Sequence, residues 1–212
     1  MATLPPLNTP FLDKLKFALP LCSFGERQID YVTQALTEHG SGSAISTNGK
    51  GYRNRVRFNL TPENAPLIVE CGPNRPDHHH WLMTFEYNPS RLDESQRKAL
   101  LRTMKELLGP DARGLLAKAC LLEPHLTFDV PHPLDSILIE SRTKTTSATW
   151  GKNFGAGGVQ QTQYLGSFNS DNQQCIYDKS SHLWDTKLLR IDGARTRFED
   201  RISLARVGVP LY

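Results

Sequence analysis

Apolar and polar residues alternate in short runs along most of this 212-residue chain, and only two segments have the clear spacing of an amphipathic helix. The clearest run covers residues 52–60, where Val56 and Phe58 would face one side and the intervening arginines the other. Period-two alternation is typical of half-buried strands. Further strands are predicted at residues 12–19, 66–71, 81–88, 121–130, 161–167, 173–179, 188–191 and 195–203.

The two helical segments are residues 26–38 and 91–108. A capping box of Ser23 and Glu26 precedes the first, and Ser90 is the predicted cap of the second. Glycine-rich loops are expected at residues 39–51 and 151–158. Many strands, two clear helices and no repeating strand–helix alternation predict an α+β fold, with a mostly antiparallel sheet and helices packed on one face.

Composition narrows the class of protein without naming a function. Hydrophobic residues make up 38% of the chain, enough for one sizeable core, and the net charge of +3 permits a nucleic-acid partner without requiring one. The four cysteines form no CxxC pair and no apolar run is long enough to span a bilayer, so we expect a cytoplasmic protein without membrane contact. The expected organisation is a flexible lead-in at residues 1–11, one domain at 12–204 and a tail at 205–212.

Tyr177 is the first candidate for chemistry. On a strand, Tyr177 and Lys179 share a face while Asp178 points away. A phenol can attack a phosphodiester if its proton is removed, and a nearby ammonium can offset the charge that builds on the phosphoryl oxygens. A tyrosine packed at a strand edge beside a solvated lysine would have the same spacing, so the pattern leaves both interpretations open.

A second candidate is a metal site. Alternation places His125 and Asp129 on one face of a predicted strand, and Glu86 lies on the polar face of another. One imidazole with carboxylate oxygens favours Mg²⁺ or Mn²⁺, which would polarise a scissile phosphate. An ordinary polar sheet face explains these residues as well.

Arginines form two further sets. Arg197 and Arg201 share a strand face with Glu199, where they would bind phosphate or form a ladder of ion pairs. A basic stripe on the strand at residues 52–60 fits backbone phosphates, although a solvated strand face also explains it. The stripe consists of Arg53, Arg55 and Arg57.

Five short segments, in order, resemble the Rep_trans family of replication initiation factors, found in rolling-circle plasmids, some phages and conjugative elements. They are Met83-Thr84-Phe85-Glu86-Tyr87-Asn88-Pro89, Leu126-Thr127-Phe128-Asp129, Tyr164-Leu165-Gly166-Ser167 with Ser170, Ile176-Tyr177-Asp178-Lys179 and Thr196-Arg197-Phe198-Glu199. Asp13 resembles the aspartate of the family's first strand, so the resemblance covers about residues 12–203.

The resemblance implies a sheet-based nicking domain. Its tyrosine, here Tyr177, would become linked to the 5′ phosphate of the cut strand, leaving a 3′-OH that primes synthesis. Metal positions carry over to Glu86 and Asp129, and additionally to Asp13 and Glu199. The implied partners are origin DNA with a single-stranded or hairpin nick site, a host helicase and polymerase, and a second copy of the chain in a homodimer.

Two histidines depart from the family pattern. His125 and His182 stand where acidic residues are expected, which puts the metal shell in doubt. A DNA-binding protein with impaired catalysis is therefore one alternative, and retention of Tyr177 and Lys179 argues against it. A conjugative relaxase is another, because it would share the chemistry and differ only in what happens to the cut strand.

Overall fold

A computed structural model describes residues 7–39, 51–60, 66–74, 80–138, 147–154, 158–166, 171–180, 182, 193–204 and 209–210. The chain divides into two compact units. We call them the helical unit, Lys14–Glu123 with Leu204–Tyr212, and the strand unit, Thr3–Asp13 with Pro124–Ser203. Both contain parts of the span predicted as one domain. Strands β1 (Phe11–Pro20) and β5 (Cys120–Val130) each contribute residues to both units.

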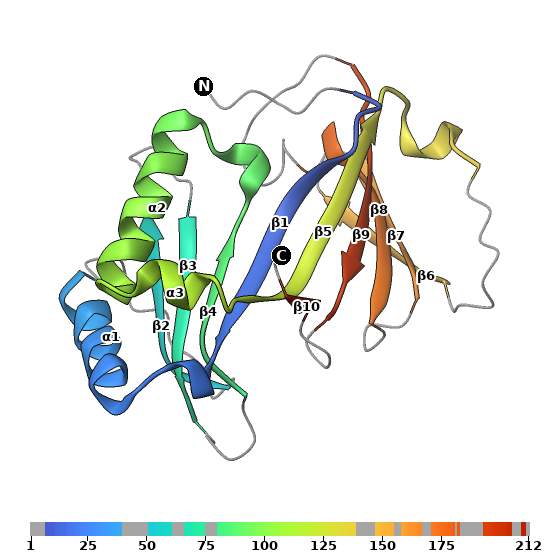
Figure 1. The fold of residues 1–212 in the computed structure, drawn as a ribbon. Helices are drawn as coiled ribbons and strands as arrows, with labels where there is room; N and C mark the ends of the chain where they lie inside the picture. Colours follow the sequence, from blue (N-terminus) through green and yellow to red (C-terminus); the bar gives the residue numbers. More distant parts are fainter. Residues whose placement is uncertain are drawn as a thin grey trace. The chain divides into compact units, whose positions relative to one another are not determined.

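The helical unit is an antiparallel sheet whose strands run in the order β2-β3-β4-β1 (Figure 1). Register aligns the apolar positions, because Phe85 of β4 lies opposite both Phe17 of β1 and Val69 of β3. The elements after β1 are η1 (Leu21–Ser23), α1 (Glu26–His39), β2 (Tyr52–Asn59), β3 (Pro66–Pro73), β4 (Trp81–Tyr87), η3 (Pro89–Arg91), α2 (Glu94–Leu108), α3 (Ala112–Leu116) and β10 (Val209–Pro210), the last paired with β5.

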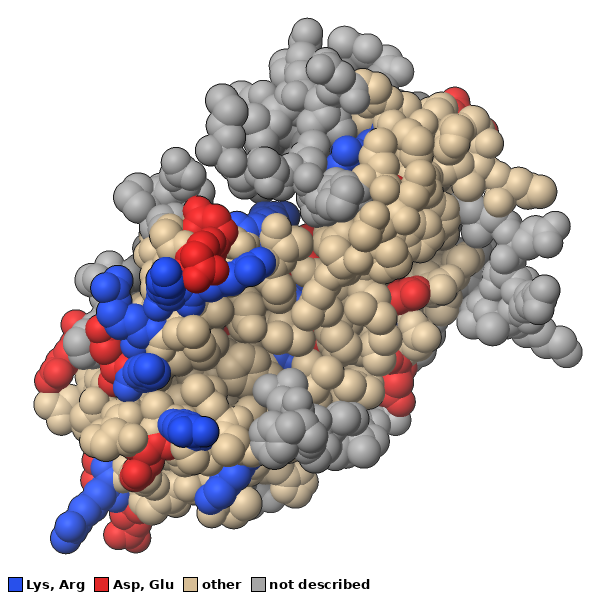
Figure 2. Space-filling view, turned by 45° about the horizontal axis from the view of Figure 1, so that its top comes forward, with Lys and Arg blue, Asp and Glu red and all other residues tan. Residues whose placement is uncertain are grey.

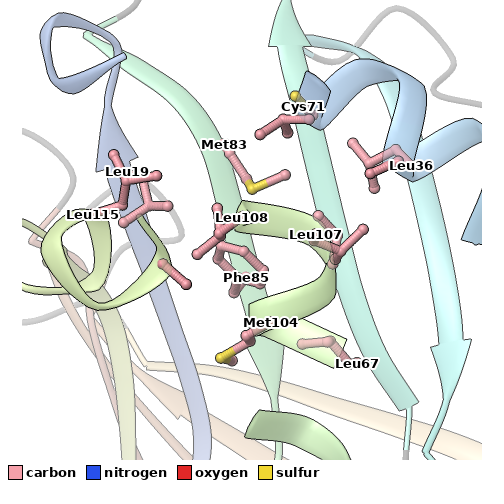
Figure 3. Close-up of a cluster of buried hydrophobic side chains, with 14 of the residues drawn as sticks. Leu19, Leu36, Leu67, Cys71, Met83, Phe85, Met104, Leu107, Leu108 and Leu115 are labelled. Atoms are coloured by element: carbon pink, nitrogen blue, oxygen red, sulfur yellow. The ribbon is translucent and has the colours of Figure 1, made fainter. Parts of the chain in front are cut away.

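Helices α1, α2 and α3 bury their apolar faces on one side of this sheet. Helix α2 has apolar residues three and four positions apart, so they line one face. Figure 3 shows Met104, Leu107 and Leu108 of this helix lying among Leu67, Met83 and Phe85 of the strands. The core of the helical unit is therefore an apolar layer between helices and sheet, as the α+β prediction required.

The opposite face of the same strands carries paired charges. Glu70 accepts a hydrogen bond from Lys16 Nζ at 2.9 Å and lies 3.6 Å from the Arg55 Nε. Lys14 Nζ pairs with Glu123 at 3.1 Å and Glu86 at 3.5 Å. Figure 2 shows Lys and Arg side chains interspersed with Asp and Glu over part of the molecular surface that it draws. Such partly exposed pairs each stabilise the fold by about 1 kcal/mol or less.

The cap of α2 differs from the prediction. Ser90 lies in η3, and the helix begins at Glu94 after Asp93. The Asp93 side chain accepts from the Gln96 backbone N–H at 2.8 Å, and the Gln96 side chain accepts from the Asp93 N–H at 2.9 Å. This is a complete capping box, so Asp93 rather than Ser90 satisfies the orphan amides of the first turn.

The strand unit continues the antiparallel pattern in the order β5-β9-β8-β7-β6. Its elements after β5 are η4 (Leu134–Ser136), β6 (Ser147–Phe154), β7 (Gly158–Leu165), β8 (Asn172–Asp178) and β9 (Thr196–Ile202). The glycine-rich loop predicted at 151–158 is wrong for residues 151–154, which pair with β7, and for Gly158, which is the first residue of β7. A ladder uses backbone groups that glycine also has, so Gly151 pairs with Gln161.

The other predicted strands are confirmed, except for the one at residues 188–191, which lies outside the described residues. Most of the loop expected at 39–51 lies outside them too. The predicted α+β class with a mostly antiparallel sheet is confirmed. Among the helices that the structure describes, none has the length and apolar character needed to cross a membrane.

Candidate active site

Strand register gathers polar side chains on one face of the strand unit. Asp129 of β5 lies opposite Arg197 of β9, which in turn lies opposite Tyr177 of β8. Directly opposed residues project to the same side of a sheet, as do residues two apart along a strand. We call the resulting set the polar face; it consists of His125, Thr127, Asp129, Gln173, Cys175, Tyr177, Arg197, Glu199 and Arg201.

Arg197 is the most constrained side chain of the polar face. Its Nε donates to Oδ1 of Asp129 at 2.7 Å and its Nη2 donates to Oδ2 at 2.9 Å. Its Nη1 donates to Asp13 at 3.2 Å, and Arg195 donates to Asp129 at the same distance. Asp129 has no exposed surface and Arg197 is 2% exposed. Burial disfavours the guanidinium charge, but the hydrogen bonds to Asp129 outweigh it and raise the Arg197 pKa.

Tyr177 has cationic and imidazole neighbours. The Lys179 Nζ lies 5.6 Å from the centroid of its ring, and the His182 ring lies 5.4 Å away in an edge-on arrangement. Burial raises the pKa of the Tyr177 phenol, and Arg197 opposes that rise. The predicted neighbours Tyr177 and Lys179 therefore lie together, with a phenol that stays protonated at neutral pH. Attack by this oxygen requires a group that takes up its proton or stabilises its charge.

Glu199 forms the second ionic cluster of the polar face. Its Oε1 lies 2.7 Å from His125 Nδ1 and accepts from Arg201 Nε at 2.9 Å. Burial disfavours the carboxylate, but the bonds to His125 and Arg201 lower the Glu199 pKa to about 2. Because Glu199 is ionised at neutral pH, the hydrogen between the two groups belongs to Nδ1 of His125. His125 thus donates to Glu199 through Nδ1, and the lone pair of a neutral imidazole lies on Nε2.

The residues predicted to hold a metal ion are engaged otherwise. Both carboxylate oxygens of Asp129 accept hydrogen bonds from guanidinium groups, and a cation placed there would be repelled by Arg195 and Arg197. Within the described ranges, no three His, Cys, Asp or Glu side chains are grouped in a way that could hold an ion. In this arrangement the Asp129 side chain does not fit a Mg²⁺ or Mn²⁺ site.

Other predicted residues lie in the helical unit. Glu86 forms an ion pair with Lys14. The arginines of the basic stripe lie on the face of β2 that is turned away from the apolar core, as predicted. Arg53 is exposed and Arg55 lies close to Glu70. No contact in the structure tests whether this stripe binds DNA, and that assignment stays a prediction.

Sequence reasoning missed Arg195. Arg195 precedes β9, and its position in the sequence carries no signal of a bond to Asp129. Thr127 is 1% exposed, and its hydroxyl has no hydrogen-bond partner among the residues that the structure describes. Alternation in the sequence already places Thr127 on the strand face of His125 and Asp129.

Comparison with known proteins bears on the fold. No protein-family model and no curated protein sequence matches the chain. The rolling-circle replication initiator protein from Geobacillus stearothermophilus has a similar structure, with a TM-score of 0.51 and 17% sequence identity. The similarity covers 92% of this chain and 74% of that one. The chain therefore has a fold like that of a rolling-circle replication initiator.

Proposed function

We propose that this chain initiates rolling-circle replication by nicking and rejoining one DNA strand through Tyr177. The observation that carries the proposal is the register of β8 and β9, which sets Tyr177 opposite Arg197 on the polar face, with Lys179 close by. A potential nucleophile thus lies beside two groups that can pair with a phosphate. The initiator-like fold supports the same class of protein.

In the proposed step, the Tyr177 hydroxyl oxygen bonds to the phosphorus of one DNA linkage as the bond from phosphorus to the 3′ oxygen breaks. The phenolic proton ends on the departing oxygen, so the products are a 5′-phosphotyrosine and a free 3′-OH. Lys179 and Arg197 offset the negative charge on the phosphoryl oxygens, as preorganised cations do in other phosphoryl transfers. The reverse reaction on a second 3′-OH rejoins the strand.

The proposal is tested by trapping the covalent adduct. The protein is incubated with labelled single-stranded oligonucleotides that tile its own gene and the flanking DNA, and the products are separated on a denaturing gel. We expect an adduct with the wild type and none with Tyr177→Phe. Tyr164→Phe is the matched control, because Tyr164 lies on the neighbouring strand β7 opposite Cys175 of the polar face.

Two results would change the proposal. Equal adduct formation by Tyr177→Phe would remove Tyr177 as the nucleophile. DNA binding by the wild type without any adduct would instead favour the DNA-binding protein with impaired catalysis. Helicase, polymerase and homodimer partners belong to the same proposal and are tested by copurification once the nick site is known.

A further inference from the structure

We propose that Asp129 is a positioning residue that fixes the Arg197 guanidinium beside Tyr177, and that it is not a ligand of a divalent ion. The inference deepens the proposed function and rests on it for the role of Tyr177. Asp129, predicted as a metal ligand, would instead orient the Arg197 side chain. The Arg197 guanidinium would then supply the positive charge that pairs with the phosphate.

Asp129 and Arg197 form a bidentate ion pair. Two parallel N–H···O bonds of 2.7 and 2.9 Å join Arg197 to the two oxygens of one carboxylate. Bidentate pairs of this kind fix both the position and the plane of the guanidinium. Arg195 adds a third bond to the same carboxylate, so three of its roughly four lone-pair sites are occupied. An ion would have to displace these bonds from a carboxylate with no exposed surface.

The donors of Arg197 are only partly used. A guanidinium has five N–H groups, and Arg197 donates two of them to Asp129 and one to Asp13. Two N–H bonds therefore remain without a partner in the described part of the chain. They belong to a side chain directly opposite Tyr177 in the β8–β9 pair. A phosphate attacked by the Tyr177 oxygen would accept these bonds, while Asp129 prevents the guanidinium from turning away.

The test separates an anchor from a metal ligand. We would compare wild type with Asp129→Asn, Arg197→Lys and the variant carrying both changes. The readouts are the rate of covalent adduct formation, the dissociation constant for the same oligonucleotide, and Mn²⁺ binding to DNA-free protein followed by electron paramagnetic resonance. Asp200→Asn is the matched control, because it makes the same change on β9 but projects from the opposite face.

If Asp129 anchors Arg197, Asp129→Asn slows adduct formation at least tenfold and changes DNA affinity less than threefold. The double variant is then no slower than Arg197→Lys, because Asp129 acts only through Arg197 and its loss has no further effect once Arg197 is replaced. Mn²⁺ binding is the same in wild type and Asp129→Asn. A tenfold weaker Mn²⁺ affinity in Asp129→Asn, or losses that multiply in the double variant, would overturn the proposal.

A readout without DNA keeps this test apart from that of the proposed function. In the wild type, the Arg197 Nε–H should give a separate ¹⁵N NMR signal, because the buried bond to Asp129 protects it from exchange. Asp129→Asn should shift or broaden that signal, and Asp200→Asn should leave it unchanged. If the wild type forms no adduct, the proposed function fails, while this signal and Mn²⁺ binding still decide what Asp129 holds. An unshifted signal in a folded Asp129→Asn protein would refute the anchor.

Discussion

The two units use their antiparallel sheets in opposite ways. In the helical unit one sheet face is apolar and covered by helices, and the charges lie on the other face in partly exposed pairs. In the strand unit the polar face includes charges that are almost fully buried, namely Asp129, Arg197 and Glu199. Apolar burial stabilises a fold without directional demands, whereas buried charge is tolerated only with close partners. We infer that the helical unit mainly provides stability and that the strand unit holds groups fixed for chemistry.

The largest expected effect tests the buried charge. Arg197→Met should lower the free energy of unfolding by about 3–5 kcal/mol, because it leaves the Asp129 carboxylate buried without its main partner. Lys98→Met, which removes an exposed partner of Glu94, should change it by less than about 0.5 kcal/mol. Urea denaturation measures both. Similar small losses for the two variants would abolish the contrast between the units.

The next effect tests the apolar core. Leu107→Ala should lower the free energy of unfolding by about 2–4 kcal/mol, because Leu107 is fully buried among the sheet side chains. Leu101→Ala should have little effect, because Leu101 of the same helix is 54% exposed. Amide hydrogen exchange should quicken in α2 and β4. Equal quickening in β8 and β9 would show that the two units unfold together, and the apolar core would then stabilise the strand unit as well.

A smaller effect depends on pH. The Glu199 pKa lies at about 2 in the folded protein, below its ordinary value of 4.5. A lowered carboxyl pKa stabilises the fold above the unfolded value, and that contribution is lost as pH falls toward the folded value. The wild type should therefore exceed Glu199→Gln in stability by on the order of 2 kcal/mol at pH 6. The gap should narrow from pH 4.5 to pH 2, and a constant gap in thermal melts across this range would contradict the assignment.

The smallest expected effect concerns a helix end. Asp93→Ala should lower the melting temperature by a few degrees, since it removes the side chain that accepts from the Gln96 amide. Ser90→Ala should lower it less, because Ser90 is not the cap of α2. Circular dichroism during heating measures both variants. A larger drop for Ser90→Ala would favour the cap that the sequence predicts over the one in the structure.

Much of the fold was predictable because the signals are local. Alternation located β2 at residues 52–60 and β5 at 121–130 within a residue or two, and apolar spacing located α1 and α2. The errors have local reasons too. Ser90 and Asp93 are both good capping residues, and only the backbone geometry decides between them. Glycines at 151–158 resemble a loop, yet strand pairing needs no side chain from Gly151.

The candidate site was predictable only as a set of residues. Alternation placed Tyr177 with Lys179, and His125 with Asp129, but it does not give the register between strands. Register made Arg197 the partner of both Asp129 and Tyr177. A carboxylate that looks like a metal ligand in the sequence becomes half of an ion pair once the opposing residue is known. The bond from Arg195 has no sequence signal at all.

The bond between Asp13 and Arg197 joins residues that are 184 positions apart. Closing so long a segment carries an entropic cost and makes the contact a late one in folding. A growing chain on the ribosome would add residue 197 long after β1 has emerged. The cluster beside Tyr177 would thus be completed only after β9 has been synthesised, and a product that stops before β9 would lack the arrangement proposed to cut DNA.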